Sequence, residues 1–128
     1  MASYEDLSNR LVLITGGANG IGQAMVQAFH TQGAIVSFCD LDQTGGKRLV
    51  KGLGERISFT KVDLTREVDI KRWVAKEAKR YGNIHVLVNN AARDPRSKLE
   101  NIKDKTWDDL FAGNLRGYFL SCREASPH

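Results

Sequence analysis

A glycine-rich segment between an apolar run and a helical pattern constrains this chain more than any other feature. The segment reads Thr-Gly-Gly-Ala-Asn-Gly-Ile-Gly at positions 15–22, and the apolar run Leu-Val-Leu-Ile precedes it at 11–14. Apolar residues then recur at helical spacing on one face, at Ile21, Ala24, Met25, Ala28 and Phe29. The sequence therefore predicts a strand, a tight turn and a helix in direct succession.

A turn of this kind suits a phosphate group. Gly16 and Gly17 allow a tight turn that a Cβ would strain, and Gly20 lets the backbone approach a pyrophosphate closely. Gly22 lets the helix pack against the preceding strand. Free N–H groups at the helix start, together with the helix dipole, favour negative charge. We therefore expect a phosphate-binding turn, and a glycine turn without a ligand is the alternative.

An acidic residue follows at the spacing expected for a dinucleotide site. Asp40 ends the second apolar run, 35–39, where a carboxylate would accept hydrogen bonds from the hydroxyls of an adenosine ribose. It would also repel a 2′-phosphate, and Ala18 and Asn19 supply no cation to the glycine turn. The sequence therefore favours NAD(H) over NADP(H).

Strand and helix patterns alternate along the whole chain. We expect strands at 11–15, 35–40, 57–62 and 86–89, and helices at 20–32, 44–53, about 67–81 and about 104–122. The predicted strands are apolar on both faces, which is typical of a parallel sheet covered by helices on each side. The predicted fold class is α/β, a Rossmann-like doubly wound parallel sheet.

The last predicted helix has the clearest periodicity. Its apolar stripe comprises Trp107, Leu110, Phe111, Leu115, Tyr118, Phe119 and Cys122. Asp104 or Thr106 could cap its start. Asn114 lies within that stripe, where an amide loses solvation unless it finds partners. We expect Asn114 to hold a buried backbone group, to face a wet cavity, or only to support a neighbouring loop.

Composition excludes several classes of protein. The 128 residues are 41% hydrophobic and 27% charged, as in ordinary globular proteins. No apolar stretch approaches the roughly 18 residues of a membrane span, and the first ten residues lack a secretory pattern, so we expect a cytoplasmic protein. Cys39 and Cys122 lie in apolar patterns and are expected to be buried thiols. The three histidines show no ligand spacing, so no metal site is expected.

The net charge of +4 does not indicate nucleic-acid binding. The most basic stretch, 71–80, alternates with Glu67, Asp69 and Glu77 on a helix whose other face is apolar. This pattern is typical of an amphipathic helix with a solvated face. Neither a helix-turn-helix pattern nor a strand with interleaved aromatic and basic residues is present.

Four motifs together resemble the short-chain dehydrogenases/reductases. Segment 15–22 resembles the cofactor motif Thr-Gly-x-x-x-Gly-x-Gly, and Asp63-Leu64 resembles the pair after the third strand that contacts adenine. Asn89-Asn90-Ala91-Ala92 resembles the family's Asn-Asn-Ala-Gly, with Ala92 in place of glycine. Asn114-Leu115-Arg116-Gly117 resembles the Asn-x-x-Gly that contributes an asparagine to the catalytic tetrad.

The resemblance implies hydride transfer between NAD(H) and an alcohol or carbonyl substrate. Asn114 would be the catalytic residue present. The expected cofactor-binding residues are Gly16, Ala18, Asn19, Gly20, Ile21, Gly22, Asp40, Leu41, Asp63, Leu64, Asn90, Ala91 and Ala92. Segment 92–96, Ala-Arg-Asp-Pro-Arg, has a weak resemblance to sugar or polyol dehydrogenases, although solvated loop arginines explain it as well.

The family's serine and Tyr-x-x-x-Lys are absent from the sequence. The residues four positions after Tyr4, Tyr81 and Tyr118 are Ser8, His85 and Cys122. Residues 1–128 thus resemble the amino-terminal half of one NAD(P)-binding domain, expected to be inactive alone. An open strand edge would favour self-association. The alternatives are a non-catalytic dinucleotide-binding module and a fragment that pairs with a complete subunit.

Overall fold

The computed structural model describes residues 2–128 as a parallel sheet covered by helices. The strands are β1 (Leu11–Thr15), β2 (Ile35–Asp40), β3 (Ile57–Lys61) and β4 (Ile84–Val88), and the helices are α1 (Gly20–Thr31), α2 (Gln43–Leu53), α3 (Glu67–Tyr81), α4 (Asp104–Phe111) and α5 (Gly117–Ala125). The strand order is β3-β2-β1-β4, and all three pairings are parallel. The predicted fold class is confirmed.

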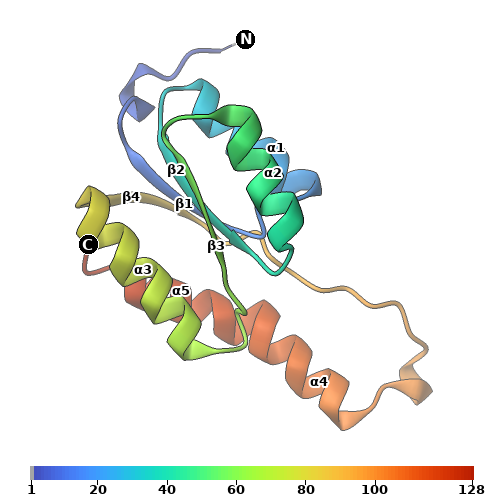
Figure 1. Ribbon diagram of the computed structural model, residues 1–128. Coiled ribbons are helices and arrows are strands. Elements are labelled where there is room, and N and C mark those ends of the chain that lie inside the picture. The colour runs from blue at the N-terminus through green and yellow to red at the C-terminus, as the bar shows by residue number, and fades with distance from the viewer. Residues whose placement is uncertain (1) are drawn as a thin grey trace.

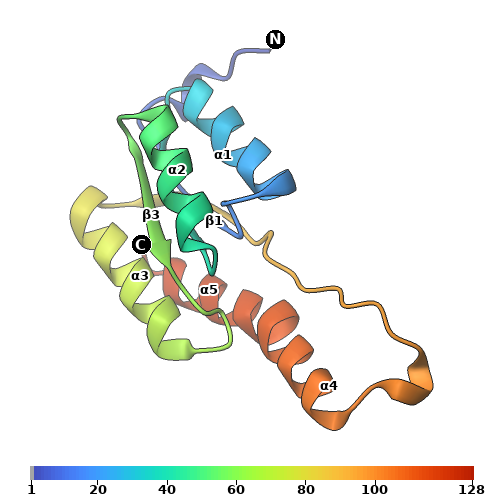
Figure 2. The ribbon, with the colours of Figure 1, turned by 45° about the vertical axis from the view of Figure 1, so that its right-hand side comes forward.

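Helices cover both faces of the sheet. In Figure 1, α1 and α2 lie on one side of the strands, and α3 and α5 lie on the other. Figure 2 shows α4 and the extended segment that follows β4 reaching beyond the sheet. None of the helices within residues 2–128 has the length and apolar character needed to cross a bilayer.

The side chains of β1 are buried in the apolar clusters on both faces of the sheet. Leu11 and Leu13 belong to the apolar cluster under α3 and α5, whereas Val12 and Ile14 belong to the cluster under α1 and α2. All five residues of β1 are buried, as predicted for a strand covered on both faces. The prediction is wrong for the outer strands, because β3 ends in the exposed Lys61 and most of β4 is only half-buried.

The pairing of β1 with β4 is interrupted by a shift in register. Leu11 pairs with Ile84 but Val12 pairs with Val86, so His85 is an extra residue on β4. The ring Nδ1 of His85 accepts the hydrogen bond of the Leu11 N–H at 3.1 Å. The side chain thereby satisfies a donor that the interrupted ladder leaves unpaired.

Polar groups on the inner face of α3 are tied to the sheet. Trp73 is fully buried, and its indole N–H donates to the Ser37 hydroxyl at 3.0 Å. Glu77, also fully buried, accepts from the Ser58 hydroxyl at 3.2 Å, and its other carboxylate oxygen lies 3.6 Å from Lys76 Nζ. These contacts fix α3 against β2 and β3.

The final helical region is not the single regular helix that the periodicity predicts. A π-helical segment, Ala112–Arg116, joins α4 to α5 and contains Asn114. The wider turn changes the side of the helix that faces the protein, because each π turn adds one residue. In α5 the buried residues are Gly117, Leu120, Ser121 and Ala125.

Several predicted core residues are therefore exposed. Trp107, Phe111, Leu115 and Phe119 expose between 46% and 61% of their surface. Cys122 is exposed as well, whereas Cys39 is buried as predicted. Ile21, predicted to lie on the apolar face of α1, is 73% exposed. The residue preceding α4 is Lys103, and neither Asp104 nor Thr106 occupies the cap position.

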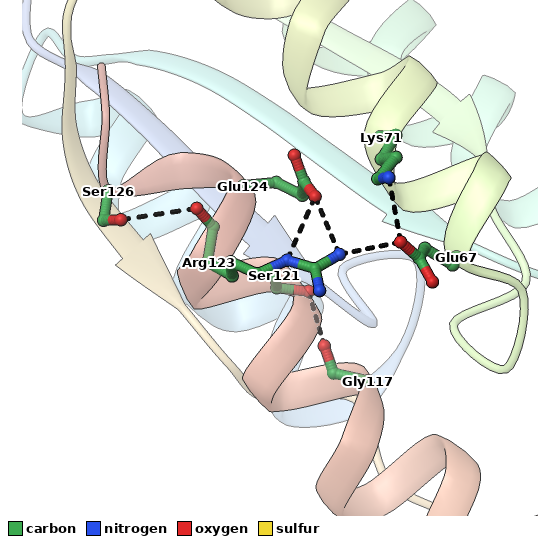
Figure 3. Close-up of polar contacts among 7 residues, drawn as sticks. All are labelled: Glu67, Lys71, Gly117, Ser121, Arg123, Glu124 and Ser126. Atoms are coloured by element: carbon green, nitrogen blue, oxygen red, sulfur yellow. Dashed lines mark hydrogen bonds and ion pairs between the residues drawn. The ribbon is translucent and has the colours of Figure 1, made fainter.

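Ion pairs connect α5 to α3 on the surface. Arg123 on α5 donates to Glu67 on α3 at 2.7 Å, and Lys71 lies 2.9 Å from the same carboxylate oxygen (Figure 3). Hydrogen bonds from Lys71 and then Arg123 lower the pKa of Glu67 from its ordinary value of 4.5. The pair is exposed to solvent, so we expect a small effect on stability.

Replacing Trp73 with alanine should destabilise the protein strongly. The variant loses a fully buried ring and leaves the Ser37 hydroxyl without its donor, and buried Trp→Ala changes typically cost about 3–5 kcal/mol. Urea unfolding followed by circular dichroism measures the change. Val68→Ala on the same helix, at a half-exposed position, is the control. Equal shifts for the two variants would contradict the packing role of α3.

Acid should weaken the connection between α3 and α5. The folded pKa of Glu67 is lowered below its unfolded value of 4.5. Its contribution to the free energy of unfolding is therefore fully present above pH 4.5 and is lost as the pH falls through the folded pKa. Glu67→Gln should therefore lower the unfolding midpoint slightly at pH 7 and not at all near pH 2. A difference that persists unchanged in acid would contradict the ion pair.

Candidate functional site

Most of the predicted site residues meet in one cavity. Parallel strands place their carboxyl ends at one edge of the sheet, and a cavity of about 420 Å³ lies there. The predicted residues that line it are Gly16, Asn19, Ile21, Gly22, Asp40, Leu41, Asp63, Leu64, Asn90, Ala91, Ala92 and Asn114. Ala18 and Gly20 do not line it, although both belong to the glycine turn.

The glycine turn is closely packed against its neighbours. Gly16 adopts a φ of +70°, and a Cβ there would lie 2.8 Å from the Cα of Ala91. A Cβ on Gly22 would lie 1.9 Å from the carbonyl oxygen of Gly16, so only glycine lets α1 begin this close to the turn. Ala18 is buried beneath the turn.

Asn90 and Thr15 fasten the turn to β4. The amide group of Asn90 donates to the carbonyl oxygens of Thr15 and Gly16 at 3.2 and 3.1 Å. The hydroxyl oxygen of Thr15 accepts from the backbone N–H groups of Asn90 and Ala91, both at 3.0 Å. The turn and the segment after β4 therefore form one rigid wall of the cavity.

Gly20 leaves open space at the start of α1. Its φ is +56°, and a Cβ built there meets no atom within 4 Å. Asn19 precedes α1, and its side chain makes no hydrogen bond to the helix start. The backbone N–H groups in the first turn of α1 therefore remain available. Open space against a glycine backbone at a helix start fits a phosphate group.

Asp40 holds the turn and retains capacity for a ligand. One carboxylate oxygen accepts from the N–H of Ala18 at 3.0 Å, and the other accepts from the N–H of Asp42 at 3.0 Å. A carboxylate has about four acceptor positions, so each oxygen can accept one more hydrogen bond. Leu41, 56% exposed, lies beside it and offers an apolar contact. Free carboxylate acceptors beside an apolar side chain fit the hydroxyl groups of a ribose diol.

The segment after β3 forms the opposite wall. Asp63 accepts from the hydroxyl of Thr65 at 2.6 Å and from its N–H at 2.9 Å, and the hydroxyl contact chiefly lowers the pKa of this carboxyl group. Gly117 supports the segment from behind, because a Cβ there would lie 3.0 Å from the carbonyl oxygen of Leu64. The apolar side chain of Leu64 and the fixed carboxylate fit a planar heterocycle.

Asn114 binds the backbone of Arg93 in both directions. Its side-chain oxygen accepts from the Arg93 N–H at 2.9 Å, and its amide group donates to the Arg93 carbonyl oxygen at 2.8 Å. Asn114 also lines the cavity. It therefore supports the segment after Ala92 and borders the cavity as well.

Cys39 lies at the cavity beneath the glycine turn. Burial raises the pKa of the Cys39 thiol well above its ordinary value, so Cys39 remains a neutral thiol beneath the turn. Residues 2–128 contain no group of three or more His, Cys, Asp or Glu side chains placed to hold a metal ion.

A second cavity, of about 500 Å³, runs beside α3 and touches the first at Leu41 and Asp63. Much of its polar lining is paired within the protein: Arg66 lies 3.8 Å from Asp69, and Lys76 donates to the Thr60 hydroxyl at 2.9 Å. This pairing distinguishes it from the first cavity, whose glycine backbone and Asp40 oxygens have free capacity.

Thr65 was not predicted as part of the site, and Thr15 and Arg93 were predicted only as members of segments 15–22 and 92–96. Thr15 stands within the glycine motif, and a hydroxyl between a buried strand and a turn was a usable signal. Thr65 follows Asp63 by two positions, a spacing at which an Asp side chain often accepts from the backbone. The contact of Arg93 with Asn114 joins positions 21 apart, which no local pattern shows.

Comparison with known proteins gives a consistent result. Residues 10–128 match the family model described as short chain dehydrogenase. A probable galactose dehydrogenase of Rhizobium meliloti is 41% identical over 132 aligned positions, which cover 99% of this chain and 51% of that protein.

Solved structures agree in fold. A short-chain glucose/ribitol dehydrogenase from Brucella melitensis superposes with a TM-score of 0.94 at 32% identity, covering 98% of this chain and 54% of that one. An NADH-dependent reductase complexed with NAD gives 0.87 at 32% identity, covering 97% and 53%. The chain thus spans about half the length of these relatives. It belongs to the short-chain dehydrogenase family.

Proposed function

We propose that this chain binds NAD(H) in the cavity at the carboxyl ends of its strands, as one dinucleotide-binding unit over residues 1–128. The observation that carries the proposal is that the glycine turn lines the cavity at Gly16, Asn19, Ile21 and Gly22, with open space at Gly20 beside them, and faces the free acceptor positions of Asp40. A pyrophosphate needs the first and an adenosine ribose needs the second. The related reductase complexed with NAD supports this choice of cofactor.

The dinucleotide would be held at successive positions across the cavity. The pyrophosphate would lie against the turn formed by Gly16, Ala18, Asn19, Gly20, Ile21 and Gly22. The ribose would contact Asp40 and Leu41, and the adenine ring would contact Asp63 and Leu64. Asn90, Ala91 and Ala92 would border the nicotinamide end. The half-exposed carboxylate of Asp40 would disfavour a 2′-phosphate by charge repulsion.

The reaction proposed for the family domain is hydride transfer between NAD(H) and a carbonyl or alcohol carbon. The bound cofactor supplies the hydride or accepts it. Asn114 would act as a positioning residue here, because it holds both backbone groups of Arg93. The sequence has no Tyr-x-x-x-Lys to move the accompanying proton, and general acid-base help contributes about 100-fold to 10,000-fold. We therefore propose cofactor binding without efficient turnover by this chain alone.

The proposed substrate class is a sugar or polyol. The names of the Rhizobium and Brucella relatives refer to galactose, glucose and ribitol, which are polyhydroxylated. In this chain the exposed segment after Ala92 borders the cavity, and Asn114 anchors that segment at Arg93. A non-catalytic dinucleotide-binding module, or a fragment pairing with a complete subunit, is the alternative, and measured turnover of a sugar panel distinguishes them.

Titration calorimetry should detect NADH binding, and Gly20→Ala should weaken it by about tenfold or more because the new Cβ occupies space that the pyrophosphate needs. Gly54→Ala is a matched control, because Gly54 also has a positive φ, +82°, and open space, but lies after α2. Both positions have a positive φ, so alanine introduces backbone strain at each of them.

Tighter binding of NADPH than of NADH by the unaltered chain would contradict the cofactor proposal. Equal loss of NADH affinity in Gly20→Ala and Gly54→Ala would contradict the proposed position of the pyrophosphate. Thermal unfolding of both variants checks that any difference in affinity is not a difference in folding.

We also propose that the chain self-associates through the outer face of α4 and α5. Trp107, Phe111, Leu115 and Phe119 follow one another at four-residue intervals and are all about half-exposed. The ring centroids of Trp107 and Phe111 lie 4.6 Å apart, so these two side chains form a contiguous aromatic pair on that face. Such a surface favours contact with a second copy. The free edge of β4 offers a second place of contact.

Phe111→Lys should therefore shift the chain towards monomer, because it places a charge in the centre of that face. Sedimentation velocity over a range of protein concentrations measures the association. Leu99→Lys, at an isolated residue that is 84% exposed, is the control and should leave association unchanged. A monomeric wild-type chain at all concentrations would refute the proposed surface.

A further inference from the structure

Asp42 makes three polar contacts in the loop between β2 and α2, and one of them joins this loop to the glycine turn. One carboxylate oxygen accepts from the side-chain amide of Asn19 at 2.8 Å, and the other accepts from the Gly45 N–H at 3.0 Å. The Asp42 N–H in turn donates to Asp40 at 3.0 Å. The sequence pattern assigned a role to Asn19 and Asp40 but none to Asp42.

Gly45 provides the room for this arrangement. A Cβ at Gly45 would lie 2.4 Å from the Asp42 carboxylate oxygen that binds Asn19, and 3.5 Å from the side-chain oxygen of Asn19. Separations below 3.0 Å require one of the groups to move. A glycine in a helix costs stability relative to alanine, and at position 45 its missing Cβ leaves room for the Asp42 carboxylate.

The second carboxylate is charged and lies near the first. Hydrogen bonds from Asn19 and then from the Gly45 N–H lower the pKa of Asp42. Arg48 is the cation whose charge acts on it, and it contributes less than these hydrogen bonds. Two carboxylates thus occupy the loop that would border the adenosine ribose, and each is tied to the glycine turn.

We propose that Asn19, Asp42 and Gly45 form a latch that fixes the glycine turn against the β2–α2 loop and makes Asp42 a second determinant of NAD(H) over NADP(H). The proposal rests on the proposed function above. Asp40 would exclude a 2′-phosphate at the ribose itself. Asp42 would add repulsion from the neighbouring position and keep the turn in the geometry that receives the pyrophosphate.

Asp42→Asn tests the charge of Asp42 separately from its hydrogen bonds. Asparagine caps helices as well as aspartate does, and the amide of Asn19 can turn so that its oxygen accepts. The ratio of the NADPH to the NADH dissociation constant should fall by about 3- to 10-fold at low ionic strength, as expected for one lost charge near a phosphate. The effect should shrink in 0.5 M salt, because salt screens exposed charges.

Asn19→Ala and Gly45→Ala test the latch itself. Each single change should weaken NADH binding several-fold, and the double change should weaken it no further, because both break the same contact. Gly52→Ala, in the same helix with open space around it, is the control for glycine replacement. Hydrogen exchange at the Gly45 amide reports the contact without cofactor and should rise in Asn19→Ala.

The outcomes separate the two proposals. If the wild-type chain does not bind NADH, both the proposed function and the latch are refuted. If it prefers NADH and Asp42→Asn keeps the full preference, only the role of Asp42 is refuted. Additive losses in the double variant, or unchanged exchange at Gly45, refute the latch and leave the proposed function intact.

Discussion

The structure depends on the close approach of α1 to the glycine turn. A Cβ at Gly22 would lie 1.9 Å from the Gly16 carbonyl oxygen and 2.6 Å from the side-chain nitrogen of Asn90. The absence of that atom lets the helix begin directly behind β1, and it lets Asn90 reach the backbone of the turn from β4. The absence of one Cβ therefore allows both the start of α1 at this position and the connection between the ends of β1 and β4 at the cavity.

Asp40 couples the shape of the cavity to its binding capacity. Its two oxygens already accept from the backbone N–H groups of Ala18 and Asp42, so the carboxylate is fixed before any ligand arrives. A preorganised acceptor loses less entropy on binding than a mobile one. The same contacts mean that replacing Asp40 would disturb the turn as well as the proposed ribose contact.

Local patterns predicted the elements and the cavity, but not the contacts between distant residues. The period of the apolar residues and the positions of the glycines gave β1, α1 and β2 within about one residue, because these signals lie within each element. The extra residue at His85 and the bond between Asn114 and Arg93 were not predicted. Each depends on residues that are distant in sequence, and a local sequence pattern does not indicate which distant residues pair.

The π-helical segment explains why the apolar periodicity of the last helical region does not match the residues that are buried there. A regular helix would bury one stripe from Trp107 to Cys122, whereas the wider turn at Ala112–Arg116 brings Asn114 to the Arg93 backbone and then buries Gly117, Leu120 and Ser121. Trp107, Phe111, Leu115 and Phe119 consequently remain about half-exposed. Positioning Asn114 and exposing an apolar face are thus two results of one distortion, so a change that straightened the helix would alter both.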